Sequence, residues 1–114
     1  MKALLFCVLA LALPQLPAKP TVILDTELGQ ITVELEPDKA PVTVQNFLRY
    51  VDGGHYKNAR FHRTVTMDNQ PNNQVKIEVI QGGVGEAFAE KDFPPIKLER
   101  TNETGLKHLD GTIS

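Results

Sequence analysis

Cysteine and tryptophan are nearly absent from this 114-residue sequence, which has one cysteine, Cys7, and no tryptophan. Cys7 lies in the middle of an apolar stretch, whereas a lipoprotein carries its acylated cysteine at the end of such a stretch. A single thiol cannot form a disulfide within the chain, and no thiolate is available beyond Cys7 for catalysis. The sequence therefore excludes a disulfide-stapled domain, and if the apolar stretch that contains Cys7 is removed as a leader, it also excludes a cysteine-dependent enzyme.

Patches of positive charge are also lacking. The 12 basic and 14 acidic residues give a formal net charge of -2 and are interspersed along the chain. Nucleic acid is not expected as a partner, because phosphate backbones attract clustered lysines and arginines. The histidines His55, His62 and His108 are scattered without the spacing of metal ligands, so we expect no metal site and no cofactor.

No apolar run is long enough to cross a membrane. The run from Ala3 to Leu13 is shorter than the roughly 20 residues that a spanning helix needs. With Lys2 before it and the breaking segment Pro14 to Ala18 after it, the run is typical of a secretory signal peptide; a buried helix or a membrane anchor is the alternative. We therefore expect residues 1–18 to be a signal peptide. The mature chain, residues 19–114, would be exported to the periplasm or the cell exterior, without stable membrane insertion after cleavage.

The mature chain begins with patterns of a β-hairpin and an amphipathic helix. Residues 21–26 are rich in β-branched and aliphatic side chains, and residues 30–36 alternate apolar with polar side chains. Glu27 to Gly29 supplies a turn between these two predicted strands. After Pro37, apolar residues recur at helical spacing, which predicts a helix over about Pro41–Asp52 that caps the sheet.

A second pair of strands is predicted over residues 59–65 and 75–81, joined by the polar turn of residues 66–74. Arg63 and Gln81 would then lie on neighbouring strands. After Gly82 the periodicity is weak and a long loop is expected. The last residues read as the start of another strand. We therefore expect a mainly β fold that is the incomplete, N-terminal part of a domain.

Five short motifs follow one another in the order found in bacterial cyclophilins, and the resemblance extends from about Thr21 to Ser114. They are Thr26-x-Leu28-Gly29-x-Ile31, Ala40-Pro41-x-Thr43-x-x-Asn46-Phe47, Gly54-His55-Tyr56, Phe61-His62-Arg63 and Gln81-Gly82-Gly83. The resemblance implies a closed antiparallel β-barrel capped by helices. It also implies peptidyl-prolyl cis-trans isomerase activity toward proline-containing peptides and unfolded client proteins, without a metal or cofactor.

The same resemblance assigns roles to individual residues. Arg63 matches the catalytic arginine of the family, and Gln81 matches the glutamine that contacts the substrate backbone and orients that arginine. Val79 falls at an apolar pocket position, and Phe61 and Gly82 complete the predicted substrate-binding set.

Three departures from the family pattern leave alternatives open, and one of them is that the later half of the domain, which carries most of the proline pocket in the family, is missing. Glu78 stands where cyclophilins usually have an aromatic pocket residue, and the connection from Arg63 to Gln81 is longer than in compact members. The alternatives to an isomerase are a non-catalytic module that binds proline peptides, or an inactive fragment. The pattern does not specify an oligomeric state.

Overall fold

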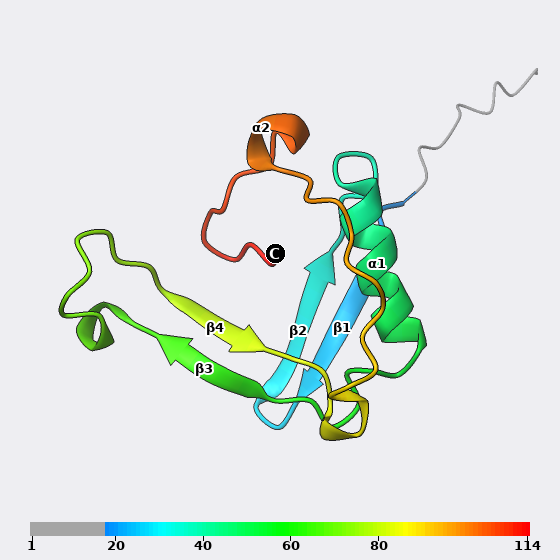
Figure 1. The fold of residues 1–114 in the computed structure, drawn as a ribbon, viewed down its shortest axis with the longest axis horizontal. Helices are drawn as coiled ribbons and strands as arrows, with labels where there is room; N and C mark the ends of the chain where they lie inside the picture. Colours follow the sequence, from blue (N-terminus) through cyan, green and yellow to red (C-terminus); the bar gives the residue numbers. More distant parts are fainter. Residues whose placement is uncertain (1–17) are drawn as a thin grey trace, which may run out of the picture.

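The structure is a computed structural model that describes residues 18–114, so the predicted signal peptide lies outside the described residues except for Ala18. The described residues form two hairpins, a helix packed on one of them and a C-terminal segment with little regular structure (Figure 1). No helix among the described residues is long and apolar enough to cross a membrane. In chain order the elements are β1 (Thr21–Thr26), β2 (Gly29–Glu34), α1 (Pro41–Asp52), β3 (Phe61–Val65), the 3-10 turn η1 (Met67–Asn69), β4 (Val79–Gly82), the 3-10 turn η2 (Glu86–Phe88) and α2 (Thr101–Thr104).

The first hairpin forms where the sequence predicts it, although its second strand, predicted over residues 30–36, spans Gly29–Glu34. β1 and β2 pair antiparallel, with Thr26 opposite Gly29 and Thr21 opposite Glu34. Gly29 has a φ of 129°, which side chains with a Cβ rarely adopt, so glycine suits this turn. The Thr26 hydroxyl reinforces the turn by donating to the Gly29 carbonyl at 2.6 Å.

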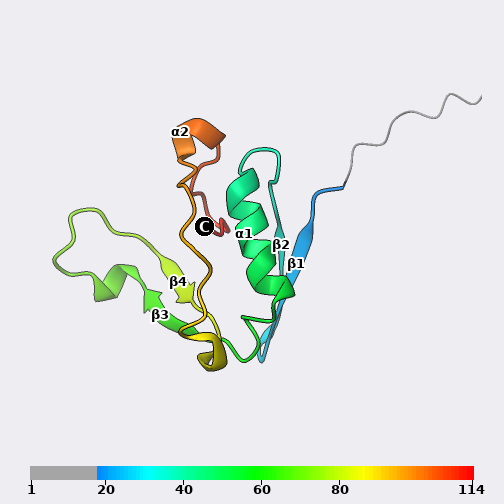
Figure 2. The same cartoon turned by 45° about the vertical axis from the view of Figure 1, so that its right-hand side comes forward.

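The main apolar core lies between this hairpin and α1. Val33, Leu35 and Val44 are buried together, so the helix covers one face of the hairpin (Figure 2). Partly buried apolar side chains surround them: Val22, Leu24, Phe47 and Leu48. The alternation of the second strand predicted this buried face, because every second residue of a strand points to the same side.

The second hairpin pairs β3 with β4 in a separate two-stranded sheet. The predicted strand over residues 75–81 is too long, because β4 begins only at Val79. Ile77 is instead held by the Gln70 side chain, which accepts from the Ile77 N–H at 3.2 Å and donates to its carbonyl at 2.6 Å. Within residues 18–114 the two sheets do not join, so the closed barrel implied by the resemblance is not formed.

The turn after α1 joins the two hairpins. His55 is 7% exposed, and its ring lies 4.9, 4.5 and 5.0 Å from the rings of Tyr50, Phe88 and Phe93. The Gly85 N–H donates to the His55 carbonyl at 2.7 Å. The turn is therefore held against the segment that follows β4 by both a backbone hydrogen bond and aromatic packing.

The segment after η2 returns along α1 (Figures 1 and 2). The Arg49 guanidinium lies 4.0 Å from the centre of the Phe93 ring, and the Phe93 N–H donates to the Tyr50 hydroxyl at 3.0 Å. Farther along, Glu99 Oε1 accepts from the Thr43 N–H at 2.6 Å and from the Thr43 hydroxyl at 2.7 Å. Glu99 thus caps the first turn of α1, for which Ala40 provides no side-chain cap.

Replacing Gly85 by alanine should destabilise the junction between the hairpins. A Cβ at this position would overlap the Lys57 carbonyl oxygen, and because that oxygen belongs to the backbone, the chain would have to shift to make room. We expect Gly85→Ala to lower the free energy of unfolding by about 1–3 kcal/mol in urea titrations of the full-length protein.

The matched control is Gly83→Ala, whose Cβ would meet the His62 ring at an ordinary 3.6 Å. This variant should stay within about 0.5 kcal/mol of wild type. Equal stabilities of the two variants would show that the close approach at Gly85 does not hold the junction.

Glu99→Gln should make the protein less stable at neutral pH but not in acid. Hydrogen bonding from the Thr43 backbone N–H, aided by its hydroxyl, lowers the pKa of Glu99 from its ordinary 4.5. A lowered folded-state pKa contributes stability above the unfolded-state value, and this contribution is lost as the pH falls through the folded value. The difference in stability between wild type and Glu99→Gln should therefore be constant above about pH 5 and should disappear as the pH falls below 4.5. Thermal unfolding across that range checks this, and a gap independent of pH would contradict it.

Candidate functional site

Arg63 and Gln81 are brought together by the β3–β4 ladder. They are direct partners in the antiparallel register, and Nη1 of Arg63 donates to Oε1 of Gln81 at 3.3 Å. Both side chains are exposed. This hydrogen bond uses only one N–H of the Arg63 guanidinium. The other N–H groups of Arg63 and the amide NH2 of Gln81 therefore stay available to a ligand.

A register shift lies immediately before this pair. Phe61 pairs with Gly82, whereas Arg63 pairs with Gln81, so His62 is the extra residue of a β-bulge. Bulges bend a strand and redirect side chains, and they are frequent beside active sites. The Phe61 ring lies close against Gly82, where an added Cβ would stand 3.3 Å from Phe61 Cδ1.

An apolar surface accompanies the polar pair. Val79 is opposite Val65 in the ladder, two residues from Gln81 and Arg63 respectively, so the four side chains share one face of the hairpin. Val65 is buried, whereas Val79 remains 40% exposed. Phe61, on the adjoining part of the strand, is 48% exposed. The predicted site residues therefore all lie on one hairpin: Arg63, Gln81 and Val79 share one open face, whereas the register places Phe61 and Gly82 on the other.

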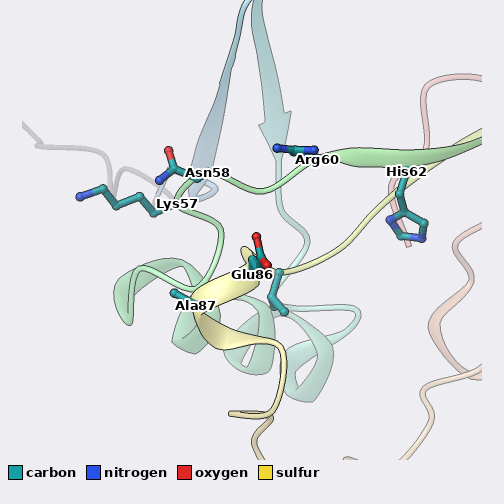
Figure 3. A pocket seen from close by; sticks show the side chains of 7 residues that line it. Lys57, Asn58, Arg60, His62, Glu86 and Ala87 are labelled. Atoms are coloured by element: carbon teal, nitrogen blue, oxygen red, sulfur yellow. The ribbon is translucent and has the colours of Figure 1, made fainter.

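Two hollows flank this hairpin. A hollow of about 670 Å³ lies at the start of β3 and contains neither Arg63 nor Gln81. Its lining is Lys57, Asn58, Arg60, His62, Val84, Glu86 and Ala87. Figure 3 shows Glu86 rising from η2 toward the space between Asn58 and Arg60, while Lys57 points away. With charges of both signs and no specific pairing among them, this hollow offers no defined ligand chemistry.

The second hollow, of about 470 Å³, has Arg63 in its wall together with the loop between η1 and β4. The composition of this loop predicts only a polar turn, and its place beside Arg63 was not predicted. The signal available was its length, because Arg63 and Gln81 are 18 residues apart although they are paired neighbours.

No cluster of side chains among residues 18–114 could hold a metal ion. His55 is enclosed by aromatic rings, His62 lines the first hollow, and His108 is exposed. What the hairpin can offer chemically is a fixed cation, a neutral amide and a small apolar surface. These are groups that bind and orient a peptide rather than attack it.

Comparison with known proteins agrees with this chemistry. Residues 21–114 match the family described as cyclophilin type peptidyl-prolyl cis-trans isomerase/CLD. The chain is 50% identical over 96 residues to peptidyl-prolyl cis-trans isomerase cyp18 of Streptomyces antibioticus, covering 82% of this chain and 51% of that protein. It is 39% identical over 94 residues to peptidyl-prolyl cis-trans isomerase A of Dickeya dadantii, covering 82% and 44%. Peptidyl-prolyl cis-trans isomerase B of Escherichia coli is 37% identical over 91 residues, covering 78% and 48%.

The chain spans about half the length of these curated relatives. No solved structure matches it significantly. The family match covers both hairpins, α1 and the segment that returns along it. The chain therefore belongs to the family of cyclophilin-type peptidyl-prolyl cis-trans isomerases.

Proposed function

We propose that the full-length protein is a peptidyl-prolyl cis-trans isomerase in which Arg63 stabilises the twisted X-Pro amide. The observation that carries this proposal is the hydrogen bond from Arg63 to Gln81 across adjacent strands, in a member of this family. The substrates are proline-containing peptides and unfolded client proteins. No covalent bond breaks in the reaction, so it calls for no metal or cofactor.

The chemistry explains why a fixed cation is useful. A planar peptide bond resists rotation by ~18–20 kcal/mol because the nitrogen lone pair is delocalised into the carbonyl. At the perpendicular transition state the lone pair returns to nitrogen, so an N–H aimed at that atom binds the twisted state better than either planar isomer. This difference in binding is what lowers the barrier.

Arg63 alone accounts for part of the acceleration. A charge-assisted hydrogen bond contributes roughly 1.5–3 kcal/mol, and each ~1.36 kcal/mol is a factor of ten in rate, which gives about ten- to a hundredfold. The rest would come from positioning: Gln81 holds the guanidinium and the substrate backbone, while Val79, on the same face of the hairpin, contacts the proline ring.

The place of action is proposed to be an exported compartment, either the periplasm or the cell exterior. Its support is the signal-peptide pattern of residues 1–18, with Lys2 followed by a short apolar run. Proteins that arrive unfolded there would contain X-Pro bonds that exchange only over tens to hundreds of seconds, so an isomerase would shorten a slow folding step.

Arg63→Ala in the full-length protein should lower kcat/KM for isomerisation by about ten- to a hundredfold, because it removes the charge-assisted bond to the twisted amide. Exchange NMR on a blocked Ala-Pro-Ala peptide measures the rate directly. The matched control is Arg60→Ala, an arginine of the other hollow, which should leave the rate unchanged. Equal rates for Arg63→Ala and wild type would refute the assigned role.

A non-catalytic peptide-binding module is the second candidate, favoured by Glu78. This carboxylate is exposed immediately before β4, where the family usually has an aromatic residue. If this candidate holds, the wild type should bind proline peptides without accelerating isomerisation, and Glu78→Phe should raise the rate by supplying an apolar contact. An active wild type whose rate Glu78→Phe leaves unchanged would reject it.

A further inference from the structure

The hollow beside Arg63 is built from two different parts of the chain. Arg63, Thr64 and Val65 of β3 form one wall, and the loop from Asn69 to Ile77 forms the other. Its volume of about 470 Å³ falls within the range of sites that bind ligands, ~300–1,000 Å³. Since Arg63 belongs both to this hollow and to the pair with Gln81, the hollow continues the surface proposed to hold the X-Pro bond.

Internal hydrogen bonds fix the shape of this loop. Gln70 is 7% exposed, and besides holding both backbone groups of Ile77 its amide donates to the Thr66 carbonyl at 2.7 Å. Asn69 accepts from the Thr66 N–H and donates to the Thr64 carbonyl, both at 2.9 Å. The wall is therefore formed before any ligand arrives, which reduces the entropy cost of binding.

The free groups of the wall match a peptide backbone. Asn72 is exposed and makes no side-chain hydrogen bond within residues 18–114, and Asn73 uses only its Nδ2, on Gln70. A side-chain amide both donates and accepts, as a peptide group does. Val75 and Ile77 add apolar surface and are 83% and 52% exposed. Arg63 is the only charged side chain in the lining, so a polyanion, which requires several cations, does not fit.

We infer that the loop between β3 and β4 forms an added subsite that binds the extended peptide residues flanking the target proline. The subsite rests on the proposed function, because its occupant continues the chain whose X-Pro bond lies over Arg63. With this subsite, the preferred substrate is a longer unfolded segment that contains the proline, rather than an isolated X-Pro unit. The amides of Asn72 and Asn73 bind the backbone of that segment, and Val75 contacts its side chains.

The test compares two blocked peptides with the same Ala-Pro-Ala centre, one ending there and one extended on both sides by alanine and leucine residues. Exchange NMR gives kcat/KM for each peptide with the full-length wild type and with Asn72→Ala/Val75→Ala. We expect the double variant to lose about tenfold on the long peptide and to keep the wild-type rate on the short one. If the double variant shows the same ratio of long-peptide to short-peptide kcat/KM as the wild type, the proposed subsite is overturned.

A matched control separates a local effect from loss of surface in general. Asn102→Ala/Leu109→Ala removes an exposed amide and an exposed apolar side chain that line neither hollow. This control should keep the wild-type rates on both peptides. A tenfold loss on the long peptide in the control as well would contradict a local subsite.

Binding measurements separate failure of the subsite from failure of the isomerase assignment. The long peptide is titrated into 15N-labelled protein, and the side-chain amide signals of Asn72 and Asn73 are followed. If the wild type binds but does not isomerise, about tenfold weaker binding by Asn72→Ala/Val75→Ala supports the subsite while the isomerase proposal fails. Unshifted amide signals at saturation, or unchanged affinity, overturn the subsite even in an active isomerase.

Discussion

The backbone hydrogen bond from Gly85 to the His55 carbonyl, at 2.7 Å, is the contact on which the arrangement of the two hairpins depends. Neither hairpin pairs with the other, so their relative position is set by the turn after α1 and the segment after β4. The buried His55 ring fills the space between these segments and α1. Because protein interiors tolerate little change in volume, this junction transmits its geometry to β3 and hence to Arg63.

Local patterns in the sequence were sufficient to predict the first hairpin, its buried face and α1. Alternation and helical spacing report which side of an element is apolar, and here a single core between hairpin and helix satisfies both patterns. The start of β4 was not predictable in this way. Residues 75–77 alternate like a strand, but the buried Gln70 side chain occupies the hydrogen-bonding groups of Ile77 that a partner strand would use. The alternation of apolar and polar residues cannot reveal that the Gln70 side chain, seven residues away, competes for these backbone groups.

The structure brings the predicted site residues onto one hairpin, whereas the surroundings of these residues were not predicted. The sequence placed Arg63 and Gln81 on paired strands, and the ladder confirms that pairing. The bulge at His62 and the hollow beside Arg63 depend on register and on loop closure, which the alternation of polar and apolar residues does not encode. The roles of all five predicted site residues stay predictions: Arg63, Gln81, Phe61, Val79 and Gly82.

The Glu99 carboxylate has a consequence for the order in which the chain can fold. The residue that caps α1 is made 56 residues after the Thr43 that it binds. At translation rates of ~5–20 residues per second, the helix start waits roughly 3–11 s for its partner after it has been synthesised. During that interval the first turn of α1 relies on water and on packing against the β1–β2 hairpin. Until Glu99 has been synthesised, the first turn of α1 therefore lacks its side-chain cap.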